Sequence, residues 1–167
     1  PISAWTSYAY IFMGNLLISK SIGEGEEPTN GSNLFTKNPV FPFLMGIMAL
    51  IVGTSSFVYH ASQTRIGRFM DLANIMVMGT FAMFYTIIDL YEEDISDWLV
   101  NVLAVGAWLG SFLLAYTVRF IFGEYSVYKY VPVTSAVMAS MIRLKGMEDA
   151  NWEYFYSTLA FFGTASL

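Results

Sequence analysis

Long apolar stretches constrain the fold of this chain more than any other feature. Between clusters of charge the sequence runs for roughly 16–25 residues at a time with almost no Asp, Glu, Lys or Arg, and about 20 apolar residues in a helix cross a hydrocarbon core of about 30 Å. A backbone in lipid must satisfy its own N–H and C=O groups, which a helix does within itself. The pattern therefore predicts an all-α, integral membrane helical bundle.

The apolar stretches divide the chain into six predicted transmembrane helices, which together form a single domain over residues 1–167. A polar, glycine-rich loop follows the first helix, and an acidic loop of sequence YEEDISD separates the third from the fourth. Because each crossing reverses the direction of the chain, alternate loops are expected on opposite sides of the membrane. The predicted helices cover residues 5–22, 39–60, 68–90, 98–122, 127–141 and 152–167.

Composition supports a multi-pass membrane location and excludes several other classes of protein. Only 13% of the residues are charged and 56% are hydrophobic, whereas about 25% of the residues in a globular domain are charged. The chain has no cysteine, so disulfides and thiolate metal sites are excluded. A net charge of −5 without a basic stripe argues against a nucleic-acid partner.

The distribution of basic residues leaves the orientation open, and with it the identity of the membrane. The positive-inside rule compares Lys and Arg on the two sides, and the predicted helices divide them equally. One side holds Arg65, Arg68, Arg119 and Lys129, and the other holds Lys20, Lys37, Arg143 and Lys145.

Three polar residues at one end of the second and third predicted helices are the strongest candidates for chemistry. Ser56 and His60 are four residues apart and share one helix face. Asp71 follows eleven residues after His60, about one turn into the next helix, on the same side of the membrane. Ionisable residues within membrane helices are costly and usually face a bundle interior or a water-filled cavity. The spacing therefore predicts that the three side chains converge in one pocket.

This spacing resembles the signature of the alkaline ceramidase-like family of seven-helix membrane hydrolases, in the wider group that includes the adiponectin and progestin receptors. The opening sequence PISAWTSYAYIFMG resembles the first helix of bacterial members, and GRFMD at 67–71 resembles their third-helix entry. The resemblance implies that His60 is a ligand of a catalytic Zn²⁺, that Asp71 orients or deprotonates the metal-bound water, and that Ser56 hydrogen-bonds within the site or to the developing oxyanion. Zinc lowers the pKa of bound water from about 15.7 to about 7 and polarises a carbonyl group.

The resemblance also implies ligands that this sequence does not contain. A His-x-x-x-His pair on the seventh helix supplies two zinc ligands in the family, whereas His60 is the single histidine here. We expect the remaining ligands on a seventh helix after Leu167, which would begin beside His60. Family members bind calcium through acidic residues, the last of them two positions before the first-helix Trp. Ser3 stands at that position before Trp5, so no such calcium site is predicted.

Other polar residues of the predicted helices have structural interpretations that compete with functional ones. Ser56 either acts directly in the site or hydrogen-bonds to a carbonyl of its own helix and packs against a neighbouring helix. Ser55 is the alternative candidate for the serine of the site. Asn74 either joins the Asp71 network or makes a hydrogen bond between packed helices. Arg119 is interpreted as a snorkelling charge at the membrane interface. The acidic residues of 89–97 are interpreted as a solvated loop that caps two helices.

Two functions from different classes follow from these observations. The first is a zinc-dependent intramembrane hydrolase that cleaves the amide bond of ceramide-like membrane lipids with a metal-activated water, with ester or phospholipid substrates left open. The second is a non-catalytic membrane receptor, or an accessory subunit of a larger membrane assembly, because one histidine cannot form a three-imidazole site. The gene sequence after the codon for Leu167 discriminates between them.

Overall fold

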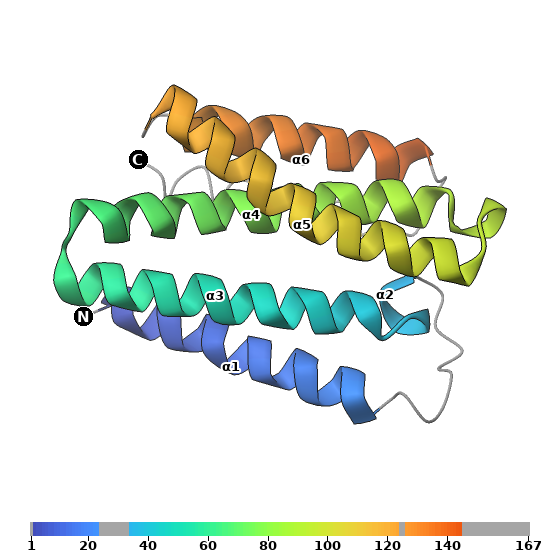
Figure 1. Ribbon diagram of the computed structural model, residues 1–167, viewed down its shortest axis with the longest axis horizontal. Coiled ribbons are helices and arrows are strands. Elements are labelled where there is room, and N and C mark those ends of the chain that lie inside the picture. Colours follow the sequence, from blue (N-terminus) through green and yellow to red (C-terminus); the bar gives the residue numbers. More distant parts are fainter. Residues whose placement is uncertain (1, 24–33, 124–125, 145–167) are drawn as a thin grey trace.

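The computed structural model describes residues 2–23, 34–123 and 126–144, and all the regular structure in this part of the chain is helical (Figure 1). The prediction of an all-α fold is confirmed for these residues. The sixth predicted helix, at 152–167, lies outside them. The elements are α1 (Ile2–Gly23), α2 (Leu34–Lys37), α3 (Val40–Ser62), α4 (Arg65–Leu90), the 3₁₀ turn η2 (Glu92–Asp94), α5 (Asp97–Phe122) and α6 (Ser126–Leu144).

Three of the described helices are long and apolar enough to cross a membrane. They are α3 and the 26-residue helices α4 and α5. That the chain has six transmembrane helices stays a prediction. The surface of α5 has the composition of a lipid-facing helix. Only 22% of its most apolar 18-residue stretch is buried. Its exposed residues are mostly large and apolar, and they include Leu109, Leu113, Phe120, Ile121 and Phe122.

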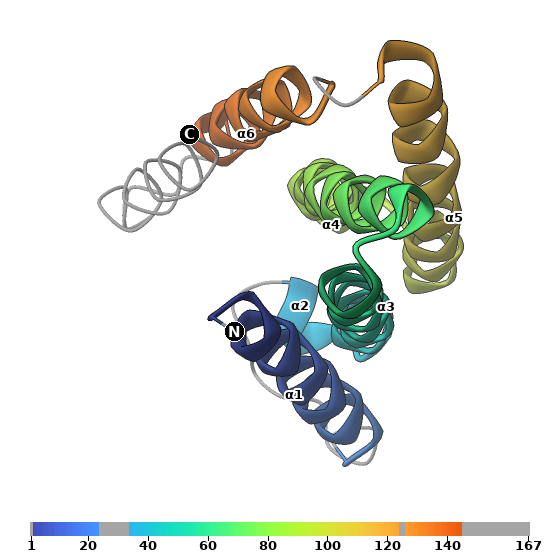
Figure 2. The same ribbon diagram turned by 90° about the vertical axis from the view of Figure 1, so that its left-hand side faces the viewer.

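Helix α4 lies at the centre of the molecule. Viewed along the helices, it has α3, α5 and α6 around it, while α1 packs along α3 (Figure 2). A buried apolar layer joins α3 to α4 and includes Phe41, Met48, Met76 and Phe81. A polar contact joins α4 to α6, because the hydroxyl oxygens of Thr80 on α4 and Tyr130 on α6 are 2.7 Å apart.

A tight turn joins α3 to α4 and sets the register between them. Gln63 adopts a left-handed conformation with φ 53°, and its backbone N–H donates to the Tyr59 carbonyl oxygen. Thr64 then caps α4, because its side-chain oxygen accepts a hydrogen bond from the Gly67 N–H at 3.1 Å. The predicted link at 61–67 is therefore too long, since α4 begins at Arg65 as soon as this cap is made.

Helices α1 and α3 pack with their backbones in close contact. A Cβ at Gly46 would lie 2.8 Å from the Gly14 carbonyl oxygen, and a Cβ at Gly53 would lie 2.8 Å from the Ser7 carbonyl oxygen. Small residues at these points allow the close approach that membrane helices use for packing. These contacts lay α1 antiparallel along α3, so that the first turns of α1 are the ones nearest the end of α3 that carries Ser56 and His60.

Candidate functional site

The structure brings the three predicted site residues together where α3 ends and α4 begins. Ser56 and His60 lie half-buried on the last two turns of α3, and Asp71 is buried on the second turn of α4. The Ser56 hydroxyl and the His60 imidazole both interact with the Asp71 carboxyl group. The short turn at Gln63 and Thr64 produces this arrangement, because it returns the chain at once along the same face of α3.

Asp71 is the residue of the cluster whose burial is energetically most costly. Its side chain is only 8% exposed, and its Oδ1 atom is buried without a hydrogen-bond partner among the described residues. A buried carboxylate costs free energy unless charge or hydrogen bonds compensate it. The chemistry of the cluster is therefore that of a carboxylate with spare acceptor capacity, beside one imidazole and one hydroxyl group.

Ser55 and Asn74 belong to a separate network that holds helices together. Asn74 Nδ2 donates to Ser55 Oγ at 2.9 Å, and the Tyr116 hydroxyl donates to Asn74 Oδ1 at 3.0 Å. The network links α3, α4 and α5 and uses both ends of the amide. The alternatives left open by the sequence are thereby separated, since Ser56 faces Asp71 whereas Ser55 and Asn74 make a packing contact.

Arg119 differs from its sequence interpretation. A snorkelling charge would extend to the surface, whereas Arg119 is 3% exposed on α5. Its guanidinium carbon lies 5.2 Å from the centroid of the Phe69 ring on α4. A cation over an aromatic face gains electrostatic stabilisation that grows when water is excluded, and this contact contributes to holding Arg119 inside the bundle.

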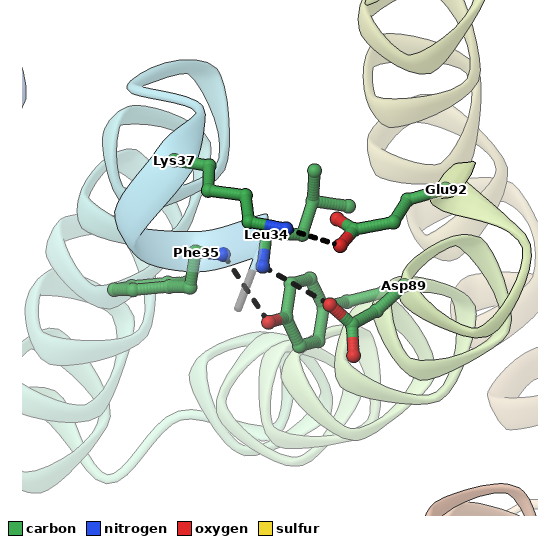
Figure 3. A network of polar contacts seen from close by, with 6 residues as sticks. Leu34, Phe35, Lys37, Asp89 and Glu92 are labelled. Carbon is green, nitrogen blue, oxygen red and sulfur yellow. Dashed lines mark hydrogen bonds and ion pairs between the residues drawn. The ribbon is translucent and has the colours of Figure 1, made fainter. Parts of the chain in front are cut away.

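The opposite end of α4 holds a second buried aspartate, Asp89, whose partners are structural (Figure 3). Its Oδ1 accepts the Leu34 N–H at 3.1 Å, and the neighbouring Tyr85 hydroxyl accepts the Phe35 N–H at 3.3 Å. Lys37 on α2 forms an ion pair with Glu92 at 2.7 Å. The acidic loop is thus only partly the solvated cap expected from the sequence, because Asp89 is buried and fastens α2 to α4.

An apolar groove lies along α3 and α4 at the end that carries Asp71. Its volume is about 360 Å³, and the residues that line it include Ile51, Thr54, Val58, Gly67 and Met70. Ser55 and Asn74 also line it, and their polar groups already bond to each other. The groove therefore offers an apolar environment of the kind that suits a hydrocarbon chain.

Tyr10 on α1 lies near enough to the cluster to sense the Asp71 charge, but no hydrogen bond joins Tyr10 to the Asp71 Oδ1 among the described residues. It is half-buried, and its phenol group interacts electrostatically with the Asp71 carboxyl. A tyrosine in an apolar stretch is normally a packing or interfacial residue. Tyr10 differs in its partial burial from Tyr8 on the same helix, which is exposed and packs its ring on Phe57.

The donor set of this cluster suits part of a zinc site. His60 can contribute one imidazole nitrogen, and Asp71 has an oxygen without a partner that can accept from a bound water. The described residues contain no group of three or more His, Cys, Asp and Glu side chains close enough to hold a metal ion. Among the described residues, His60 and Asp71 thus offer one imidazole and one carboxylate, which is fewer than the three protein ligands of a catalytic zinc site.

Comparison with known proteins does not add to this description. The chain matches no protein-family model, no curated protein and no solved structure. The functional argument therefore rests on the residues themselves, on their geometry and on the resemblance noted from the sequence.

Proposed function

We propose that this chain is a multi-pass membrane protein of the alkaline ceramidase-like type, and that it hydrolyses the amide bond of ceramide-like lipids. The observation that supports the proposal most strongly is Asp71, a buried carboxylate with an unused oxygen that is hydrogen-bonded to Ser56 and close enough to His60 to interact with its charge. Such a cluster is costly in an apolar bundle and calls for a functional reason.

The proposed chemistry assigns one task to each of the three side chains. His60 holds Zn²⁺ through a ring nitrogen, and the metal when bound lowers the pKa of a water and polarises the amide carbonyl. Asp71 accepts a proton from the attacking water on its free oxygen and returns it to the departing nitrogen as the C–N bond breaks. Ser56 donates a hydrogen bond to the carboxylate or to the carbonyl oxygen as negative charge develops there.

An apolar groove suited to a lipid chain lies on a neighbouring face of α3 and α4, and Ser56, His60 and Asp71 are not among the residues that line it. The groove along α3 and α4 is apolar, and its volume of about 360 Å³ lies in the range of small-molecule pockets. The exposed apolar face of α5 favours a membrane setting for the whole bundle. We propose that an acyl chain reaches the site laterally from the bilayer, so that membrane lipids are the partners of this protein.

The full-length gene product, purified in detergent, allows a direct test of this function. Wild type is expected to contain one Zn²⁺ per chain and to hydrolyse a fluorescent ceramide, and His60→Ala is expected to lose both properties. Ser62→Ala is the matched control, because Ser62 lies at the same end of α3, is exposed and bonds locally to the Val58 carbonyl oxygen. Zinc binding and hydrolysis that persist in His60→Ala would exclude the proposal.

A non-catalytic receptor or accessory subunit on the same fold is the second candidate. The presence of a single histidine favours it, because three imidazoles cannot come from this sequence alone. It predicts that the full-length protein binds ceramide without turnover and that His60→Ala leaves ceramide binding unchanged. A measured turnover that depends on His60 would exclude it.

A further inference from the structure

The apolar groove along α3 and α4 opens on a neighbouring face of the helix pair, away from the Asp71 cluster. Ser56, His60 and Asp71 are not among the residues that line it. Ser55 does line it and precedes Ser56 on α3, and consecutive residues of a helix point about 100° apart. A molecule in the groove is therefore not presented to the Asp71 carboxyl group, and the groove is a site of its own.

The polar side chains at the floor of the groove bond to one another and to their own helices. Asn74 Nδ2 donates to Ser55 Oγ at 2.9 Å, and Ser55 Oγ donates to the Val52 carbonyl oxygen at 3.0 Å. Asn74 Oδ1 accepts a hydrogen bond from the Tyr116 hydroxyl at 3.0 Å. Because these groups are already paired, a polar ligand gains little from them, and the floor favours an apolar occupant.

The walls of the groove are apolar side chains that stay partly exposed. Val58 on α3 is 49% exposed and Met70 on α4 is 42% exposed, and Leu50 and Ile51 continue the wall along α3. Both helices are long and apolar enough to cross a membrane. In a bilayer, the medium that meets these side chains is hydrocarbon rather than water.

The extent of the groove along α3 matches one leaflet of a bilayer. It runs from Leu50 to Val58, which is about 12 Å at a rise of about 1.5 Å per residue, and α3 ends four residues later at Ser62. One leaflet contributes about 15 Å of hydrocarbon, half of a core of about 30 Å. The groove therefore reaches from near the end of the span to its middle, at the end where a turn joins α3 to α4 (Figure 1).

This shape suits a thin, flexible chain better than a transmembrane helix of a second copy. Membrane helices pack through small residues that let their backbones touch, as Gly46 and Gly53 do between α3 and α1. The groove is instead walled by Leu50, Ile51 and Met70, and it covers only about half of the span. An acyl chain needs no more room than this.

Two hydroxyl groups lie at the outer end of the groove. Ser62 follows Val58 by one turn on the same side of α3, and its Oγ is 3.2 Å from Thr64 Oγ1 in the turn. Both residues are exposed. At the boundary of a bilayer such hydroxyls can donate to the ester or phosphate oxygens of a lipid.

We propose that this groove binds one acyl chain of a bilayer phospholipid, which lies along α3 and α4 with its headgroup at the turn between them. The chain comes from the leaflet on the Asp71 side, and the lipid acts as a structural partner rather than as a substrate. Anything that binds the folded protein alone stabilises it, so the lipid should stabilise the α3–α4 pair. The proposal does not rest on the hydrolase function.

Filling the groove tests the proposal in the full-length, detergent-purified protein with phosphatidylcholine as the probe. Val58→Trp with Met70→Trp adds bulk at two partly exposed positions of the groove, and Leu113→Trp on α5, at a residue that is 73% exposed, is the matched control. Native mass spectrometry should show one retained lipid per chain in wild type and in the control, and none in the filled variant. Added phosphatidylcholine should raise the Tm of wild type and of the control by about 2–4 °C, and leave that of the filled variant unchanged.

Photo-crosslinking locates the lipid in the wild-type protein, so the test does not depend on the folding of a variant. Phosphatidylcholine with a diazirine in the middle of one acyl chain, in nanodiscs, should label Ile51, Thr54 and Met70 more strongly than Leu109 and Leu113 of α5. Equal labelling, or a lipid retained by a filled variant that circular dichroism shows to be folded, overturns the proposal. A wild-type dimer that the filled variant loses also overturns it, because a second copy would then occupy the groove. Absence of ceramide turnover rejects the hydrolase function and leaves these outcomes unchanged.

Discussion

The two buried aspartates of α4 differ in their hydrogen-bond partners, and the proposed site lies at only one of them. Asp71 and Asp89 are similarly buried, at 8% and 6% exposure, and lie about 27 Å apart along the helix, close to the thickness of a bilayer core. Asp89 accepts a backbone N–H that fastens α2 to α4, whereas Asp71 keeps an oxygen without a partner among the described residues. Asp71 therefore differs from Asp89 in unused bonding capacity rather than in burial, and this difference is what supports the proposed site at Asp71.

The most direct test of the difference between Asp71 and Asp89 is to neutralise each aspartate in turn. Asp71→Asn is expected to lower kcat for ceramide by about 10²- to 10⁴-fold, because the group that accepts the proton is removed. Asp89→Asn keeps an oxygen for Leu34 and should leave kcat per folded molecule unchanged. Steady-state assays on detergent-purified protein, normalised to the folded fraction, give both values. An equal loss in the two variants would mean that the ends of α4 do not differ in role.

A pair of adjacent serines extends the comparison within α3. Ser56→Ala is expected to lower kcat by about 10- to 100-fold with little change in Tm, because its hydroxyl serves Asp71. Ser55→Ala removes the acceptor of Asn74 and should lower Tm while kcat per folded molecule stays near wild type. Parallel assays and thermal scans separate the two effects. The assignment fails if Ser55→Ala shows the larger loss of kcat.

Stability should respond most at the Asp89 end. Asp89→Ala leaves the Leu34 N–H without its acceptor and is expected to cost about 1–3 kcal/mol of folding free energy. Denaturant titration followed by circular dichroism measures this cost. The hydrogen exchange rate of the Leu34 amide should rise in the same variant, and an unchanged rate would show that Asp89 does not hold α2.

The smallest effect is expected at the ion pair of Lys37 and Glu92 on the surface. The hydrogen bond to Glu92, together with the Glu92 charge, raises the pKa of Lys37 above its usual 10.5. A raised lysine pKa means that the pair stabilises the fold at lower pH and that this contribution is lost as pH rises through the raised value. Lys37→Met should therefore lower Tm less than Asp89→Ala does, because exposed pairs contribute little.

The pH and salt dependence of Tm provides the check on this pair. The difference in Tm between wild type and Lys37→Met should close above the raised pKa of Lys37, and it should narrow as salt is added. A Tm difference between wild type and Lys37→Met that grows with pH would show that Glu92 does not stabilise the charged form of Lys37.

The sequence predicted the long helices that the structure describes because apolar length is a local property of the chain. Apolar length located α3, α4 and α5 to within a few residues, and the i, i+4 rule placed Ser56 and His60 on one face. The position of Tyr10 was not predictable, since it depends on how Gly53 lets α1 approach α3. The inward turn of Arg119 was missed for the same reason, because its partner Phe69 lies 50 residues earlier on another helix.

Zinc-edge anomalous diffraction from crystals of the full-length protein tests the central claim most directly, namely that the functional end of α4 is the end that carries Asp71. The account predicts one strong peak about 2.0–2.1 Å from a His60 ring nitrogen, on the side of Asp71. A peak among the acidic residues at 89–97, or a His60 ring with no metal within bonding distance, would contradict it.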